Sequence, residues 1–198
     1  MAKNTQPVLK RCRTLGVSPA AMGYSKTSNK NPGGQRRAKK SEYAMQLTEK
    51  QKVKFVYGIL EKQFRMYYEK AARAEGNTGE VLLSLIERRL DNVVYRLGFA
   101  STRREARQLV NHGHYTVNGK RVNIPSYLVK AGDVVAVCEK SCSNSRFKKL
   151  KEDDAFVAAP KWLDRDKNTL TGKVLALPAR DDIDFEIAEH LIVELYSK

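Results

Sequence analysis

The chain has 198 residues, 37 of them Lys or Arg and 22 Asp or Glu, and its formal net charge is +15. This length excludes a disulfide-stapled miniprotein and a pair of full-sized domains, and an apolar fraction of 41% excludes wholesale disorder. So large an excess of positive charge predicts a polyanionic partner.

Cysteine content and hydropathy predict the compartment. The three cysteines, Cys12, Cys138 and Cys142, leave one thiol unpaired in any disulfide scheme, which is typical of a reducing cytosol. No apolar run approaches the ~18 residues of a membrane span, and the first residues lack the apolar stretch of a secretory signal. We therefore expect a soluble, cytoplasmic protein.

The charge is polarised along the chain. Residues 1–41 contain ten basic and no acidic side chains, residues 42–151 have a net charge of +10, and residues 152–198 have a net charge of −5. The first block is rich in Gly, Ser, Asn and Pro and lacks apolar periodicity, so it should bury little surface. We expect a basic N-terminal arm that is mobile in the free protein and orders against phosphate; a solubilising tail is the alternative.

Helices are predicted to follow the arm. Apolar residues at i, i+3, i+4 and i+7 predict one long helix from about Thr48 to Ala74, ended by the glycines of residues 76–79. A second helix should cover residues 81–90 and a short third one residues 91–97, with Gly98 at its C-terminal end. Residues 42–90 thus form a helical domain, which residues 181–198 are expected to complete.

A compact α+β module is predicted next, over residues 91–138. Thr102 and Glu105 have the spacing of a capping box, so a helix should begin there and stop at Gly113. Asn118-Gly119 between alternating residues predicts a β-hairpin, and a further strand should follow over residues 133–137. The expected fold class is α+β, with two helices packed on a small, mostly antiparallel sheet.

The last third of the chain is less regular. Residues 139–180 form a connecting region that could belong to the module, with an anchoring contact expected at residues 160–163. Acid-rich residues 181–184 predict a cap or a solvated turn, and the alternation over residues 192–196 predicts a strand.

The helix that begins after Thr102 carries the most specific chemistry. On a wheel of 100° per residue, Ala106, Leu109 and Val110 share one arc, and the far arc holds Arg103, Arg104, Arg107, Gln108 and Asn111. Arginines in a first turn oppose the helix macrodipole, whereas beside exposed N-terminal amides they form a phosphate site. With Lys120 and Arg121 of the hairpin, this surface fits the backbone of folded RNA; a solvated basic face is the alternative.

Competing chemistries find no support in the sequence. Gly33-Gly34 lacks the Lys and Ser/Thr of a Walker motif, and no Ser or Cys stands in a nucleophile motif. Cys138 and Cys142 supply two thiols where a structural zinc site needs four ligands. We expect no enzyme, no metal and no cofactor, and we assign no chemical role to the three histidines.

Three segments are similar to one known family: LTEKQKVKFVYGILEKQFRMYYEKAAR (47–73), GNTGEVLLSLIERRLDNVVYRLGFASTRREARQLVNHGHYTVNGKRVNIPSYLV (76–129) and EHLIVELYSK (189–198). They resemble the bacterial small-subunit ribosomal protein family called "S four". The resemblance implies an N-terminal arm, a helical domain and an inserted αL-type RNA-binding module. It also implies a structural protein that binds 16S ribosomal RNA early in assembly of the subunit body.

Further expectations follow from this resemblance. Family members lie near the mRNA entry channel beside ribosomal proteins "S three" and "S five", and the interface with "S five" affects decoding accuracy. The matching mRNA-facing residues here are Arg36, Arg37, Lys39 and Lys40. Some members repress their own messenger RNA. Basic residues of the arm and the helical domain complete the expected rRNA contacts: Lys10, Arg11, Arg13, Lys50, Lys52, Lys54, Lys62, Arg65 and Arg73.

The chain departs from the family pattern in its arm. Many relatives carry four zinc-binding cysteines there, whereas this chain has only Cys12, so it resembles a zinc-free variant. The same module is also found on pseudouridine synthases and tyrosyl-tRNA synthetases, but no segment here is long enough for their catalytic domains. A stand-alone RNA chaperone that rescues large subunits is a third alternative, against which the helical domain and residues 189–198 argue.

Overall fold

A computed structural model describes residues 6–26, 41–152, 159–166 and 168–197. The chain divides into two compact units, one of Met1–Leu82 with Asp184–Lys198 and the other of Leu83–Ile183. Within the described ranges no helix has the length and apolar character to cross a membrane.

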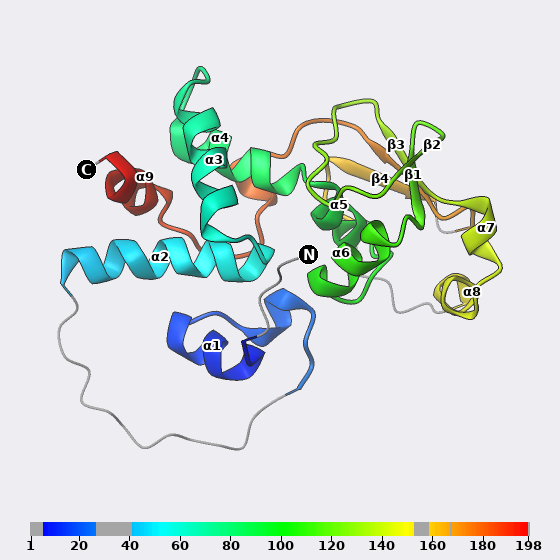
Figure 1. Cartoon of the computed structure of the whole chain (residues 1–198), viewed down its shortest axis with the longest axis horizontal. Helices are drawn as coiled ribbons and strands as arrows, with labels where there is room; N and C mark the ends of the chain where they lie inside the picture. Colours follow the sequence, from blue (N-terminus) through cyan, green and yellow to red (C-terminus); the bar gives the residue numbers. More distant parts are fainter. Residues whose placement is uncertain (1–5, 27–40, 153–158, 167, 198) are drawn as a thin grey trace. The chain divides into compact units, whose positions relative to one another are not determined.

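The first unit is helical (Figure 1). It contains α1 (Val8–Leu15), the 3-10 helix η1 (Pro19–Met22), α2 (Glu42–Tyr57), α3 (Glu61–Ala72), the beginning of α4 (Thr78–Glu87) and α9 (Glu189–Ser197). Its core is made of side chains from α2 and α3, with Val53, Val56, Phe64 and Ala71 all buried. Helix α9, from the far end of the sequence, packs against α2.

The described part of the arm is more ordered than its composition predicts. Cys12 and Leu15 of α1 are buried together with Val17 and Met22, and Gly16 ends α1 in the left-handed conformation (φ 68°). The expectation that the whole arm buries little surface is therefore wrong for residues 6–26. Helix α1 has only two turns, too few for an apolar period to be recognised in the sequence. The apolar residues along one side of it are nevertheless enough to cover a small core.

The single long helix predicted from Thr48 to Ala74 is two helices. Helix α2 begins after Ser41, whose Oγ accepts a hydrogen bond from the Ala44 amide at 3.3 Å, and ends at Gly58. Gly58 has a φ of 65°, a conformation that glycine adopts without the steric cost of a Cβ. Apolar side chains continue at helical spacing across Gly58. For this reason the hydrophobic periodicity predicts one continuous helix where the structure has two.

The strand predicted over residues 192–196 is also wrong, because these residues lie within helix α9. Ile192 is buried, and the Tyr196 ring stacks on Tyr68 and Phe64 with centroid separations of 4.7 and 6.1 Å. Glu194 accepts a hydrogen bond from Gln46 of α2 at 3.1 Å. A short apolar run fits either period, and here contacts with α2 and α3 decide.

The second unit has helices on a five-stranded antiparallel sheet, which confirms the α+β class. Its helices are the end of α4, α5 (Leu90–Arg96), α6 (Arg103–Asn111), α7 (Glu139–Cys142), α8 (Ser145–Glu152) and the 3-10 helix η2 (Arg180–Asp182). The strands are β1 (Tyr115–Val117), β2 (Lys120–Val122), β3 (Val134–Val137), β4 (Leu163–Asp166) and β5 (Thr171–Val174), in the order β2-β1-β3-β5-β4. Residues 139–180 thus contribute two strands to this sheet.

The hairpin and the start of α6 confirm two sequence predictions. Tyr115 pairs with Val122 and Val117 with Lys120, and the turn residues Asn118 and Gly119 have φ values of 50° and 77°. These positive values at both positions are those of a type I′ turn. Thr102 caps α6 by accepting a hydrogen bond from the Glu105 amide at 3.2 Å.

Candidate nucleic-acid interface

A buried polar network joins α6 to α5. Arg96 donates to the fully buried Glu87 carboxylate at 2.8 Å, and Asn92 donates a short hydrogen bond to the same carboxylate. Arg103 donates through Nε to Asn92 Oδ1 at 2.8 Å, and its guanidinium lies 4.3 Å from the centre of the Tyr95 ring. The first turn of α6 is therefore held on α5 by paired polar groups, as buried charge requires.

This network corrects the helical wheel. Arg103 is only 7% exposed, so its placement on the outward face is wrong. The Arg107 side chain is 14% exposed, with Nη1 3.8 Å from Asp91 Oδ2. A wheel describes one helix, whereas Asn92 and Asp91 on the neighbouring helix draw these two arginines inward.

The outward face of α6 is accordingly narrower than predicted. Gln108 and Asn111 are exposed and Arg104 is half-buried, while Lys120 is exposed on the adjacent hairpin. These side chains offer amide and cationic donors on one surface. Donors of this kind bind phosphate oxygens and RNA hydroxyls.

Arg121 fastens the hairpin to the end of α6. Its Nε donates to the Gly113 carbonyl at 2.8 Å and its Nη2 to the His112 carbonyl at 3.1 Å. A Cβ at Gly113 would collide with this guanidinium, and the φ of 71° there also favours glycine. Arg121 therefore satisfies carbonyls at a helix C-terminus, a role that its predicted phosphate contact did not include.

The histidines beside this surface show no catalytic arrangement. His114 Nδ1 lies 2.9 Å from Ser141 Oγ, and the His114 and His112 rings are 6.1 Å apart. Burial lowers the pKa of His114, and the positive charges of His112 and Arg121 lower it further. We therefore interpret the hydrogen bond between His114 and the Ser141 hydroxyl as a structural contact.

Several predicted cations of the helical unit are already paired. Lys50 and Lys54 contact the Glu61 carboxylate at 2.9 and 2.5 Å, and Tyr196 donates to it at 2.7 Å. Partial burial raises the pKa of Glu61, but the hydrogen bonds from Lys54, Lys50 and Tyr196 outweigh it and bring the pKa to about 2. This carboxylate ties α2, α3 and α9 together.

The other predicted cations of this unit are more accessible. Lys52 lies 3.4 Å from Glu49, and the exposed Arg65 lies 3.4 Å from Glu69. Lys62 and Arg73 are exposed. The exposed Arg65–Glu69 pair is worth little, so Arg65 can exchange its carboxylate partner for a phosphate at small cost, whereas the Lys52–Glu49 pair is largely shielded from solvent.

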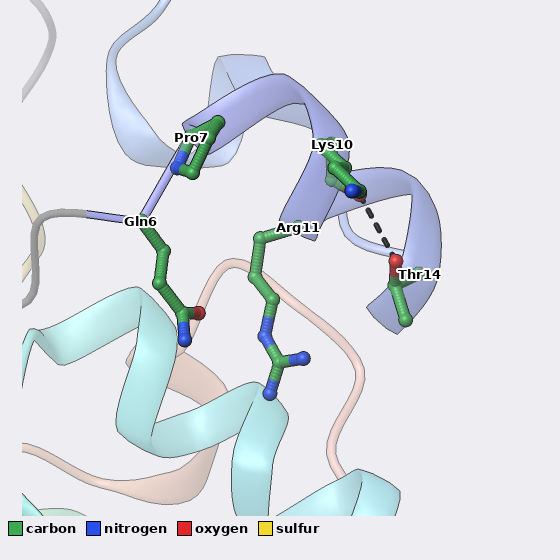
Figure 2. Close-up of a pocket in the computed structure, with 5 residues that line it drawn as sticks. All are labelled: Gln6, Pro7, Lys10, Arg11 and Thr14. Atoms are coloured by element: carbon green, nitrogen blue, oxygen red, sulfur yellow. Dashed lines mark hydrogen bonds between the residues drawn. The ribbon is translucent and has the colours of Figure 1, made fainter.

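The basic residues of α1 border a pocket of about 240 Å³, lined by Gln6, Pro7, Lys10, Arg11 and Thr14. Figure 2 shows the Gln6 and Arg11 side chains extending to the same side, while the Thr14 hydroxyl donates to the Lys10 carbonyl at 3.0 Å. Lys10 and Arg13 are exposed and Arg11 is half-buried. The four residues predicted to face mRNA, Arg36, Arg37, Lys39 and Lys40, lie outside the described residues.

A metal site finds no candidate ligand cluster among the residues the structure describes, where no three His, Cys, Asp or Glu side chains converge. Cys12 is instead buried with its Sγ 3.8 Å from Met22 Sδ. Thiol and thioether here belong to the small apolar core of the arm.

The fold and this surface define a class: an RNA-binding module of the S4 type joined to a helical domain. Comparison with known families agrees, since the S4 domain matches residues 88–135 and the "Ribosomal protein S4/S9 N-terminal domain" matches residues 3–87. Curated relatives named "Small ribosomal subunit protein uS4" extend the match to the whole chain. Those from Fusobacterium nucleatum and Lachnospira eligens are 54% and 56% identical over 198 residues, each covering 100% of both chains.

The chain therefore belongs to the uS4 family of small-subunit ribosomal proteins. A third relative of the same name, from Acetivibrio thermocellus, is 58% identical and covers 95% of this chain and 88% of its own. The expected resemblance is confirmed, and the protein is a structural component of the small ribosomal subunit rather than an enzyme. Membership of this family decides against the alternative class of RNA-modifying enzymes.

Proposed function

We propose that the chain binds 16S ribosomal RNA directly and nucleates assembly of the body of the small subunit. The observation that carries the proposal is the outward surface of α6 and the adjacent hairpin, where Arg104, Gln108, Asn111 and Lys120 present donors. The alignment of the chain with uS4 relatives over 198 residues also supports 16S rRNA as the ligand of this surface.

The surface fits the backbone of folded RNA better than a base sequence. Its long, flexible cationic side chains suit phosphate oxygens, and its amides suit 2′-hydroxyls in the wide minor groove of an A-form helix. Exposed aromatic side chains, on which unpaired bases would stack, are not part of it. Recognition by shape and charge is the expected mode.

The arm and the helical domain should extend the footprint. We assign Lys10, Arg11 and Arg13 of α1, with Lys62, Arg65 and Arg73 of α3 and its C-terminal end, to further rRNA contacts, because most of them are exposed. Lys50, Lys52 and Lys54 of α2 belong to the same proposal, although each has a carboxylate partner. The proposed site of action, in an assembling ribosome, is the cytoplasm.

Finer functions of the proposal come from the family resemblance. They are mRNA contact at the entry channel through Arg36, Arg37, Lys39 and Lys40, contact with proteins "S five" and "S three", an influence on decoding accuracy, and autorepression. The acidic tail of residues 152–198, with a net charge of −5, supports a protein-facing surface, since it would repel RNA. Crosslinking of assembled subunits tests the protein contacts, and absence of a link to "S five" would count against them.

Filter binding tests the central proposal. The purified chain and a 16S rRNA transcript are titrated at several salt concentrations, with a 23S rRNA transcript of equal length as control. Specific binding predicts tighter association with the 16S transcript throughout, and an affinity that falls linearly with log salt. Equal affinity for both transcripts would contradict the proposal.

A further inference from the structure

Helix α8 lies on the core of the second unit beside the end of α6. Its Phe147 is fully buried, with ring centroids 5.7 Å from His114 and 6.2 Å from Tyr115. Leu150 is half-buried against the same core. The helix is thus seated by one apolar edge, and the rest of its surface faces outward.

That outward surface is basic. Lys148, Lys149 and Lys151 are all exposed, and the one acid within α8, Glu152, is its last residue. Lysines near a helix C-terminus are favoured by the macrodipole, which explains part of this pattern. Three exposed lysines within four residues nevertheless repel one another, so helix stability alone does not account for them.

An ion pair connects this surface to α6. Arg146 Nη1 of α8 lies 2.5 Å from Glu105 Oε1 of α6, and Glu105 is the only acid of that helix. Its carboxylate also accepts a hydrogen bond from the Ser101 amide at 2.8 Å. The pair therefore neutralises the one negative charge of α6, which faces α8.

Each residue of the Arg146–Glu105 ion pair has a hydrogen-bond donor one helical turn further along its own helix. Lys149 follows Arg146 at i+3, and Gln108 follows Glu105 at i+3, so each shares a face with its partner in the ion pair. The outward surface of α6 consequently continues across the Arg146–Glu105 pair onto α8.

We propose that Lys148, Lys149 and Lys151 form a second phosphate-binding surface that engages the same folded RNA as α6. This inference rests on the proposed function, since it assigns α8 to the same interface. Two adjoining basic helices can contact the phosphates of both strands that border one wide minor groove of an A-form duplex. The contacts are independent of base sequence, because ammonium groups act on phosphates as point charges.

The salt dependence of RNA binding tests this surface. The variant K148Q/K149Q/K151Q should bind the 16S transcript more weakly at low salt, with a slope of log K against log salt that is shallower by about 2 to 3. The matched control K130Q/K161Q/K173Q removes three exposed lysines of the same unit and should leave the slope near that of wild type. Unchanged circular dichroism and unfolding midpoints verify that both variants fold.

Two outcomes would overturn the assignment of α8: a wild-type slope in the α8 variant, or equal losses in both variants. Failure of the wild-type chain itself to prefer the 16S transcript would instead contradict the proposed function.

The variant E105Q is an independent test of the ion pair. Its glutamine can still accept the hydrogen bond from the Ser101 amide, while Arg146 becomes available to phosphate. The slope should steepen by about 0.7 to 0.9, and an unchanged or shallower slope would remove the ion pair from the interface.

Discussion

At the scale of single residues, arginines of similar sequence context have different roles. Arg103 and Arg121 donate to groups within the protein, Arg103 to Asn92 and Arg121 to two carbonyls at the end of α6. Arg104 and Gln108 lie on the outward surface of the same helix. Arg103 and Arg121 hold α6 in place, whereas Gln108 is exposed and Arg104 half-buried on the outward surface.

Substitution of these arginines should separate structure from binding. Arg103→Met removes the guanidinium donor from the buried Asn92 Oδ1, so it should lower the free energy of unfolding by about 1–3 kcal/mol. Its salt slope for RNA binding should stay near wild type. Arg104→Gln should make the slope shallower by about 0.7 to 0.9, and it should cost less stability than Arg103→Met because Arg104 is only half-buried. Urea unfolding and filter binding measure both; a shallower slope for Arg103→Met would make it a phosphate contact.

Glu61 gives stability a defined dependence on pH. Its folded pKa of about 2 lies below the ordinary value of 4.5, so the stabilisation is present above about pH 4.5 and is lost as the pH falls toward 2. After screening by solvent, we expect Glu61→Gln to remove about 1 kcal/mol at pH 7 and almost nothing at pH 2. Unfolding midpoints across this pH range test the prediction. Equal losses at both pH values would contradict it.

At the scale of elements, β5 packs closely against Leu97, the residue that ends α5. Gly172 on β5 faces Leu97, and a Cβ there would lie 2.5 Å from Leu97 Cδ1 and Cδ2. Val174 on β5 and Leu170 on the loop before it are buried in the same core, as is Leu97 itself. Glycine is thus required by space and not by backbone conformation at this position.

Gly172→Ala should therefore destabilise the second unit. The buried leucine must move to accommodate a methyl group, and overpacking of this kind costs about 1–3 kcal/mol. Lys173→Ala, on the exposed side of the same strand, is the matched control and should change the unfolding midpoint little. Unfolding in urea measures both, and an unaltered midpoint for Gly172→Ala would show that Leu97 adjusts freely.

At the scale of the whole molecule, the chain combines a basic arm, a helical unit and an RNA-binding module within one ribosomal protein. The arm has a small apolar core around Cys12 and Met22 in place of the four cysteines expected of zinc-binding relatives. Burial of a thiol in such a core lowers its reactivity, because the thiolate is poorly solvated there.

Metal content and thiol reactivity of the purified protein test this picture of the arm. Plasma emission spectrometry should find well under one zinc per chain, since three cysteines spread over the sequence cannot make a four-thiolate site. In the free, native chain Cys12 should react with a thiol reagent at least ~10-fold more slowly than the half-buried Cys138 and Cys142. Stoichiometric zinc, or equal labelling of all three thiols, would contradict the assignment.

Much of this protein can be deduced from its sequence because the deciding interactions are local. The Asn118-Gly119 turn, the Thr102 cap and the α5 and α6 helices follow from backbone conformation and spacing within a few residues. The polarised charge likewise predicts a nucleic-acid partner without reference to any fold.

Tertiary structure decides what depends on contacts between distant residues. Residues 192–196 are helical because α9 packs on α2 and contacts α3, and β4 and β5 are strands because they extend a sheet begun at Tyr115. Arg103 turns inward because Asn92, on another helix, accepts its hydrogen bond. The sequence thus determined that the protein carries a basic, RNA-binding type of surface, and tertiary packing determined which arginines remain on it, since buried charges must first satisfy their partners within the protein.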